Sequence, residues 1–181
     1  MKNALLSLVA TISTTLLPTI LLSAQYRPVD PGSEITFTVK NFGFAVDGHF
    51  TGVRGTIDFD PEHAAAGRFD VTIDASTVNT GNSMRDSHLK NDGYFDVGNY
   101  PRIRLVSTRV TEEKPGSYTL TGELTIKDKT KSISFPFTAI PANGGMAFKG
   151  SFTINRKDFG VGGSSTIANI VTVSVNVMTS K

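Results

Sequence analysis

The segment RDSHLKNDGYFDVGNYP, residues 85–101, holds the side chains of this chain that are best suited to chemistry. It brings Asp86, His88 and Asp92 close together, in a chain that has 3 histidines in all. An imidazole beside carboxylates can bind a metal ion or can exchange protons in catalysis. The same residues can also do no more than stabilise a helix, so the local secondary structure decides between these interpretations.

A short helix from about Ser83 to Lys90 is predicted for this segment. Ser83 and Asp86 have the spacing of a capping box, and Gly93 follows as a stop signal. Residues in a helix are rotated by about 100° each, so Asp86 and His88 would point about 200° apart and could not share a metal ion. Asp86 and Lys90 would lie one turn apart, as in a helical ion pair. The pattern therefore favours a structural role over a metal site.

The other candidate sites carry weaker patterns. His49 and His63 have no second ligand at metal-binding spacing. The glycine-rich stretch RKDFGVGGSST, residues 156–166, could form an anion-binding nest of backbone amides beside Arg156 and Lys157, but glycines are typical of hairpin loops as well. The G-x-S-x-G turn of serine hydrolases is missing from the sequence. No cofactor and no metal is predicted for this chain.

The first 24 residues have the composition of an export signal. Lys2 is followed by an uncharged stretch from Ala4 to Ala24 that is rich in apolar residues and ends in small ones. This pattern predicts a cleaved signal peptide over residues 1–24, with a retained membrane anchor as the alternative. Export would place the protein in the periplasm.

The remaining chain is nearly neutral and has no cysteine. Without Lys2 it has 17 basic and 16 acidic residues, scattered singly along the sequence. Nucleic-acid binding is not indicated, because neutralising a phosphate backbone requires clustered basic residues. With no cysteine, disulfides and thiolate metal sites are excluded, so stability must come from a core.

Alternation of apolar and polar residues predicts strands through nearly all of this remaining chain. We expect eight strands, each apolar on one face, over residues 34–40, 51–60, 68–75, 102–107, 118–127, 132–139, 146–155 and 170–178. One further helical turn is predicted from Asn41 to Val46. Pro136 interrupts a strand pattern and is placed at a bulge or at an unpaired position.

Strands with one apolar face must bury that face, and too few helical segments are predicted to cover it. The sheet must therefore close on itself or fold into two facing sheets. Eight antiparallel strands that close into a barrel leave an interior that side chains just fill, or that holds one small ligand. The inward positions carry Phe, Ile, Leu and Val, so any cavity would be apolar.

Four stretches of the chain resemble one known family. They are FTVKNFGFAVDGHFTGVRGTIDFD, DASTVNTGNSMRDSHLKNDGYFDVGNYPRIRL, LTGELTIKDKTKSISFPF and FTINRKDFGVGG, and together they are similar to the YceI family of bacterial periplasmic proteins. The resemblance spans residues 29–178 and implies an all-β fold, an eight-stranded antiparallel lipocalin-like β-barrel with one or two short helices. It also implies binding of a long-chain amphiphile such as a polyisoprenoid or a fatty-acid derivative. Asn41 stands where many members have a histidine, so no titratable or metal-binding group is expected there.

The predicted function is that of an exported binding protein, not an enzyme, that sequesters or carries a lipid. Its partner would be an isoprenoid or fatty-acid-type lipid, without nucleic acid, without stable membrane insertion after signal cleavage, and with a homodimer as a further option. Inward parity predicts an apolar lining of Phe37, Phe59, Phe69, Ile73, Leu120, Phe135, Phe148 and Phe152. Charge and position predict a polar mouth formed by Arg85, His88, Arg156 and Lys157.

Two alternatives stay open. The first is an enzyme that uses Asp86, His88 or Asp92 in acid/base catalysis. The second is a filled barrel without a pore, which would act through its surface as a stress-protective or partner-binding module.

Overall fold

The computed structural model describes residues 24–163 and 166–181 of the chain. The described residues form nine strands: β1 (Gln25–Asn41), β2 (Phe44–Phe50), β3 (Arg54–Asp58), β4 (Arg68–Asp74), β5 (Arg102–Lys114), β6 (Ser117–Ile126), β7 (Lys129–Ala142), β8 (Gly145–Asn155) and β9 (Ile167–Ser180). One α-helix and three 3-10 helices connect them: η1 (Pro61–Ala66), η2 (Ala75–Thr77), α1 (Ser83–Leu89) and η3 (Arg156–Phe159). The predicted signal peptide, residues 1–24, lies outside the described residues except for Ala24.

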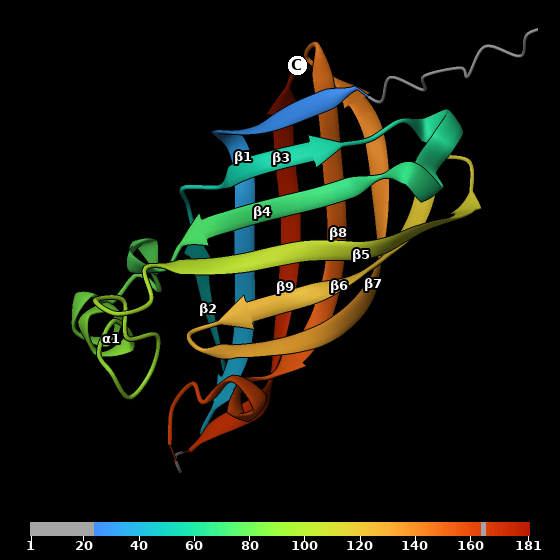
Figure 1. Cartoon of the computed structure of the whole chain (residues 1–181). Helices are drawn as coiled ribbons and strands as arrows, with labels where there is room; N and C mark the ends of the chain where they lie inside the picture. The colour runs from blue at the N-terminus through green and yellow to red at the C-terminus, as the bar shows by residue number, and fades with distance from the viewer. Residues whose placement is uncertain (1–23, 164–165) are drawn as a thin grey trace, which may run out of the picture.

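Eight of these strands close into an antiparallel barrel. Hydrogen-bonded neighbours follow the order β1-β3-β4-β5-β6-β7-β8-β9, and β9 pairs again with β1 (Figure 1). The same eight strands are predicted by the alternating pattern. Along β6 every second residue is buried, as expected of a strand with one face toward a core. The prediction of an eight-stranded antiparallel barrel with few helices is therefore confirmed.

The ninth strand, β2, is not predicted by the sequence pattern. It pairs with the second half of β1 in a register that ends at Asn41 opposite Phe44. Phe42 and Gly43 form the two-residue turn between the strands, with φ angles of 50° and 85°. Two consecutive positive φ angles reverse the chain into a tight hairpin. The helical turn predicted over residues 41–46 is therefore wrong.

A bulge in β1 explains how this strand serves both β3 and β2. β1 pairs with β3 at residues 25–26, and its register with β9 shifts between Val29 and Glu34. Beyond the bulge, β1 leaves β3 and takes β2 as its neighbour. The outer edge of β2 meets the rest of the described chain through one isolated bridge, between His49 and Asn79. At this part of the barrel the wall must therefore be completed by something other than a strand.

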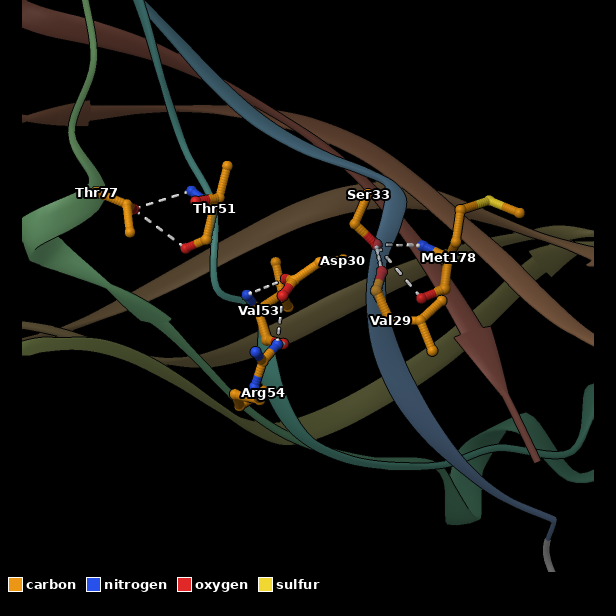
Figure 2. Close-up of polar contacts among 8 residues, drawn as sticks. All are labelled: Val29, Asp30, Ser33, Thr51, Val53, Arg54, Thr77 and Met178. Atoms are coloured by element: carbon orange, nitrogen blue, oxygen red, sulfur yellow. Dashed lines mark hydrogen bonds and ion pairs between the residues drawn. The ribbon is translucent and has the colours of Figure 1, made fainter.

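Polar contacts hold the bulge on both sides (Figure 2). Asp30 accepts hydrogen bonds from the amide of Val53 (3.1 Å) and from the guanidinium of Arg54 (2.8 Å), at the start of β3. The hydroxyl of Ser33 accepts a hydrogen bond from the amide of Met178 (2.9 Å) in β9. The bend of β1 is thus fixed by the two strands between which it lies.

Aromatic side chains fill one end of the barrel. The ring of Phe59 is fully buried and makes edge-to-face contacts with Phe69, Tyr118, Phe137 and Phe148, with ring centroids 5.1 to 6.1 Å apart. We call these five residues the aromatic plug. Because the plug closes one end, the interior can be open only toward the other. Among the described residues, no helix combines the length and the apolar composition needed to cross a bilayer.

The barrel wall is split between β7 and β8. Their pairing ends at Phe137 opposite Gly150, so Pro136 has a partner in β6 and none in β8, which agrees with the unpaired position predicted for it. Beyond this point Phe135 and Phe152 stack, with ring centroids 4.7 Å apart. Side chains therefore take over from backbone hydrogen bonds in closing this part of the wall.

Candidate functional site

The barrel encloses an apolar cavity of about 870 Å³. Apolar side chains from all nine strands line it, and one example from each, in chain order, is Ile35, Phe50, Ile57, Val71, Leu105, Leu124, Phe135, Phe152 and Val173. The volume lies within the range of roughly 300–1,000 Å³ that is usual for small-molecule pockets. The described interior is thus hollow, which argues against the filled-barrel alternative.

Most of the apolar residues predicted for the interior lie on this cavity. Seven of the eight line it: Phe37, Phe69, Ile73, Leu120, Phe135, Phe148 and Phe152. Phe59 is the exception, because its ring lies inside the aromatic plug and has no exposed surface. Parity along a strand identifies the inner face, but depth along the barrel decides between lining and packing. Contact of these residues with a lipid stays a prediction.

This difference between plug and lining can be tested with Phe59→Leu. Leucine retains most of the apolar volume but loses the edge-to-face contacts, so we expect the free energy of unfolding to fall by about 1–2 kcal/mol. Lipid affinity should stay within about twofold of the parent protein, because the variant leaves the cavity wall intact. Urea unfolding and a lipid titration measure the two quantities. A large loss of affinity at unchanged stability would place Phe59 on the lining after all.

The segment of residues 80–95, which includes α1, lies on the side of the barrel where β2 is (Figure 1), and its residues line the cavity there. Its apolar residues Leu89 and Phe95 pack on the barrel core, and the ring of Phe95 meets Phe50 edge-to-face at 5.4 Å. Its polar residues on the cavity are Thr80, Asn82, Arg85, Ser87, His88, Asn91 and Tyr94. Polar residues are therefore most numerous in this segment, and the other polar residues on the wall are spread over the strands and η3: Thr36, Asn41, Thr72, Arg104, Lys149 and Arg156.

Arg85 lies on the cavity and also braces this segment. Its Nε donates to the hydroxyl of Thr80 (2.7 Å) and its Nη2 to the carbonyl of Thr80 (2.8 Å). The helix that carries it begins at Ser83 as predicted, but Asn82, not Ser83, caps it by accepting from the amide of Arg85 (3.0 Å). The side chain is thus positioned by Thr80, and its predicted contact with a ligand head group remains a prediction.

Asp86 has a different partner from the one its spacing suggests. Its carboxylate accepts from the amide (2.8 Å) and from the hydroxyl (2.6 Å) of Thr80. In the described chain, Asp86 and Lys90 form no ion pair, although they lie one helical turn apart. The predicted pairing is therefore wrong. Asp86 is turned back toward the residues before the helix, where it satisfies a backbone donor.

The three candidates for acid/base catalysis do not converge. The ring of His88 lies against the edge of Tyr94, with centroids 5.0 Å apart. Asp86 is held by Thr80, and Asp92 accepts from the amide of Gly93 (2.7 Å). Among the described residues there is also no group of three His, Asp or Glu side chains that could hold a metal ion. The segment gives no arrangement that would join these groups in one reaction.

Arg156 is buried near the start of β9, with 4% of its surface exposed. Within the described chain its guanidinium donates to four backbone carbonyls: Nε to Ala168 (3.0 Å), Nη1 to Val161 (2.7 Å) and Gly162 (3.1 Å), and Nη2 to Ile167 (2.9 Å). Although the side chain also lines the cavity, these bonds show that it organises the glycine-rich loop. A role toward a ligand stays a prediction for Arg156.

Lys157 and the loop amides are engaged in the fold itself. Lys157 does not line the cavity, and its ammonium donates to the carbonyl of Gly163. The amides of Gly160, Val161 and Gly162 each donate to a protein carbonyl, at 2.8 to 3.0 Å. An anion-binding nest would need these amides free to face a ligand. The loop interpretation of this stretch is therefore the better one.

The charged residues on the cavity wall are all basic. They are Arg85, Arg104, Lys149 and Arg156, and within the described chain neither Asp nor Glu lines the cavity. Arg104 also pairs with Asp70 through two hydrogen bonds of 2.8 and 2.6 Å, and this contact lowers the pKa of the Asp70 carboxyl. Arg104 and Lys149 are exposed and alternate with inward-facing neighbours on β5 and β8, and Arg156 is bonded to backbone carbonyls. Arg85 is therefore the cation placed to meet a negatively charged group in the cavity. The wall thus favours an anionic head group over a cationic one.

Some lining residues lie outside the eight predicted strands, and two of them are in β2. Val46 and Phe50 line the cavity, but their strand is hidden by the helical interpretation of residues 41–46. Their alternation with polar residues in FAVDGHF was the signal that could have found them. Tyr94 and Phe95 were missed for another reason, because they lie in a loop whose packing has no sequence period.

Comparison with known sequences identifies similar proteins over nearly the whole described chain. A family model described as a YceI-like domain matches residues 26–179. A UPF0312 protein of Shewanella denitrificans is 30% identical over 169 residues, which cover 88% of this chain and 87% of that protein. A UPF0312 protein of Pseudomonas paraeruginosa is 31% identical over 149 residues, which cover 77% of this chain and 78% of that protein.

Solved structures with the same fold include BcnA of Burkholderia cenocepacia. Its TM-score is 0.77 at 27% identity, over 82% of this chain and 96% of that protein. The YCEI protein of Campylobacter jejuni matches with a TM-score of 0.67 at 27% identity, over 75% of this chain and 85% of that protein. A polyisoprenoid binding domain from Saccharophagus degradans matches with a TM-score of 0.67 over 87% and 98% of the two chains, and at 14% identity this likeness concerns the fold alone.

Proposed function

The chain belongs to the YceI family, and from this premise we propose that it is an exported binding protein that sequesters or carries a long-chain amphiphile in its barrel. The ligand would be a polyisoprenoid or a fatty-acid-like lipid, and the site of action would be the periplasm. The observation that carries the proposal is the apolar cavity of about 870 Å³ with polar residues most numerous in the segment that includes α1. The polyisoprenoid binding domain of Saccharophagus degradans has the same fold, so this architecture is compatible with the proposed ligand class.

The expected driving force is the burial of an apolar chain. Transfer of apolar surface out of water contributes about 25 cal/mol per Å², so a chain that buries roughly 300 Å² would gain roughly 7 kcal/mol before the costs of association. An alkyl chain would need few polar contacts there, because the cavity-lining residues on the strands are mainly aliphatic and aromatic. Selectivity would then come from chain length and from the head group.

The head group would lie at residues 80–95. Arg85 and His88 are the residues of this segment that can carry positive charge on the cavity wall. Neither Asp nor Glu occurs in the described lining, so no negative side chain there would repel a carboxylate or a phosphate. An acidic lipid, with its tail toward the aromatic plug and its head beside α1, fits this distribution of charge.

Native mass spectrometry of the protein purified from its own host tests the proposed function. We expect a bound lipid whose mass corresponds to a long alkyl or isoprenoid chain, and extraction should convert the complex into the mass of the chain alone. A clean mass of the unliganded chain, together with failure to bind added prenyl phosphates or fatty acids, would contradict the proposal. It would favour action through the surface of the barrel instead.

The head-group assignment predicts a selective effect of Arg85→Ala. A charged hydrogen bond contributes about 1.5 kcal/mol or more, so affinity for a fatty acid should fall roughly tenfold. Affinity for the fatty alcohol of equal chain length should change by less than about twofold, because it has no charge to lose. Titration of both ligands gives the ratio of the two affinities, which is insensitive to any general loosening of the segment.

Two further variants complete this test. Arg85→Lys should recover part of the selectivity, since it restores the charge without the forked geometry. Arg109→Ala is the matched control, because Arg109 is exposed on β5 and does not line the cavity. Equal losses of fatty acid and fatty alcohol in Arg85→Ala would show that Arg85 acts only as a brace.

A further inference from the structure

The large apolar side chains that the described surface exposes are concentrated near one end of the barrel. They are Phe42 (74% exposed), Phe44 (78%), Met84 (82%), Ile170 (57%) and Ile140 (51%). Phe42 lies in the turn of the β1–β2 hairpin and Phe44 directly after it, Met84 lies on α1, and Ile170 lies near the start of β9. Ile140 alone lies elsewhere, near the turn that joins β7 to β8.

This concentration coincides with the mouth of the cavity. Asn41 and Val46 line the cavity directly beside the two exposed phenylalanines, and Met84 is both on the cavity and exposed. Ile167, at the start of β9, also lines it and pairs with Asn41. Exposed apolar side chains therefore lie next to cavity-lining residues in three places: the β1–β2 hairpin, α1 and the start of β9. We call Phe42, Phe44, Met84 and Ile170 the apolar rim.

The hairpin tip is unusual in both its conformation and its exposure. Phe42 has a φ of 50°, a left-handed conformation that bulky side chains rarely adopt, and a two-residue turn of this kind favours Asn or Gly instead. Phe44 lies opposite Asn41, on the inward-facing side of β2, but at this height no other strand covers it. Both side chains are largely exposed, so packing within the described chain stabilises neither ring much. Local rules are usually broken in this way where a surface has a function.

The charge of this end is compatible with a surface of lipid head groups. Residues 39–46 and 159–171 contain Lys40 as their single charged residue, with Asp47 and Asp158 directly outside them. The helix α1, which carries Met84, adds Arg85 and Asp86, and the Asp86 carboxylate is bound by Thr80. Phosphates would therefore meet no carboxylate from these two segments. With so little charge, adhesion would have to come from burying the aromatic rings among lipid chains and head groups.

We infer that the apolar rim docks on the surface of a lipid bilayer, so that the mouth of the cavity opens onto the membrane. A lipid would then pass between bilayer and barrel without crossing water. This inference rests on the proposed function, since docking serves the exchange of a cavity-bound lipid. It commits to a bilayer rather than to a protein partner because the rim lies next to the lining of a cavity suited to lipid.

The chain has no tryptophan, which allows a direct test of docking. In Phe44→Trp the probe lies in the rim, and in Ile140→Trp it lies at the other exposed apolar position. Each protein is mixed with vesicles of phosphatidylethanolamine and phosphatidylglycerol. We expect the emission of the Phe44→Trp protein to shift to the blue and to be shielded from iodide, and that of the Ile140→Trp protein to remain unchanged. No shift in either protein, or an equal shift in both, would overturn the inference.

Removal of the rim gives a second readout. In Phe42→Ser/Phe44→Ser, flotation with the same vesicles should fall about tenfold, and transfer of a fluorescent fatty acid from vesicle to protein should slow by a similar factor. Affinity for the fatty acid in solution should be unchanged, and Ile140→Ser should behave as the parent in all three assays. Loss of solution affinity together with flotation would instead assign the rim to the binding site.

These assays separate the two proposals. A protein that floats with vesicles but carries no lipid keeps the docking inference and contradicts the proposed function. A protein that binds lipid but does not float with vesicles supports the proposed function and contradicts the docking inference. Light scattering decides the remaining occupant: a dimer that Phe42→Ser/Phe44→Ser converts into a monomer, without vesicle binding by the parent, would show that a second copy of the chain covers the rim.

Discussion

Val173→Glu should reduce lipid affinity at least about 100-fold, because it places a carboxylate in the middle of the apolar cavity. Val173 lines the cavity on β9, and its register partners on either side are Phe37 in β1 and Phe152 in β8. A bound alkyl chain would remove the water that an ionised carboxylate needs. That desolvation costs about 3 kcal/mol or more, and no basic partner lies at the neighbouring register positions. Titration with a fatty alcohol measures the loss without a contribution from the ligand's own charge.

Thr172→Glu is the matched control for this variant. Thr172 is the preceding residue of β9, and it is exposed on the outer face of the barrel. The two variants have the same new charge on the same strand but on opposite faces. We expect Thr172→Glu to bind lipid as the parent does and to unfold at a similar urea concentration. A folded Val173→Glu protein with the parent's affinity would contradict lipid binding inside the barrel.

How much of the fold follows from the sequence can be seen by comparing β6 with β2. In β6 a polar residue alternates with each inward-facing residue along the whole strand, so its inward face is predicted correctly. β2 has the same parity, but it is only 7 residues long and Phe42-Gly43 precedes it. Apolar residues in such a short segment fit a helical turn as well as a strand. Pairing with β1 across the two-residue turn decides the matter.

The site was predictable to the extent that it depends on parity. Phe135 and Phe148 line the cavity because they point inward on regular strands. Phe59 points inward too, but its place in the aromatic plug depends on which rings meet at one end, and no local pattern records that. Likewise, the charge of Arg156 suggested a ligand contact, whereas its donors are directed at the carbonyls of a neighbouring loop. Hydrogen-bond partners that are chosen by tertiary structure are beyond the reach of sequence spacing.

Arg156→Ala should lower the free energy of unfolding by about 3–5 kcal/mol. The substitution leaves four carbonyls, those of Val161, Gly162, Ile167 and Ala168, without the guanidinium that binds them. A buried carbonyl that loses its donor costs about 1–3 kcal/mol, and partial access of water reduces the sum. Arg156→Lys should be intermediate, because one ammonium cannot reach all four acceptors. Urea denaturation of the three proteins gives the order of stability.

The same variant decides between the structural and the ligand-binding role of this residue. Lys157→Ala is the control at the next position, and it should stay within about 0.5 kcal/mol of the parent, because its side chain is more exposed and has one hydrogen bond to Gly163. If Arg156 acts only on the loop, the ratio of fatty-acid to fatty-alcohol affinity should be unchanged in the folded fraction of Arg156→Ala. A fall in this ratio equal to that of Arg85→Ala would show that Arg156 also contacts the head group.

Because the amide of Gly162 donates to the carbonyl of Gly93 (2.8 Å), the loop that Arg156 organises is joined to the segment next to α1. Loosening the loop should therefore also loosen the wall that carries Arg85, and hydrogen exchange at residues 80–95 would detect it.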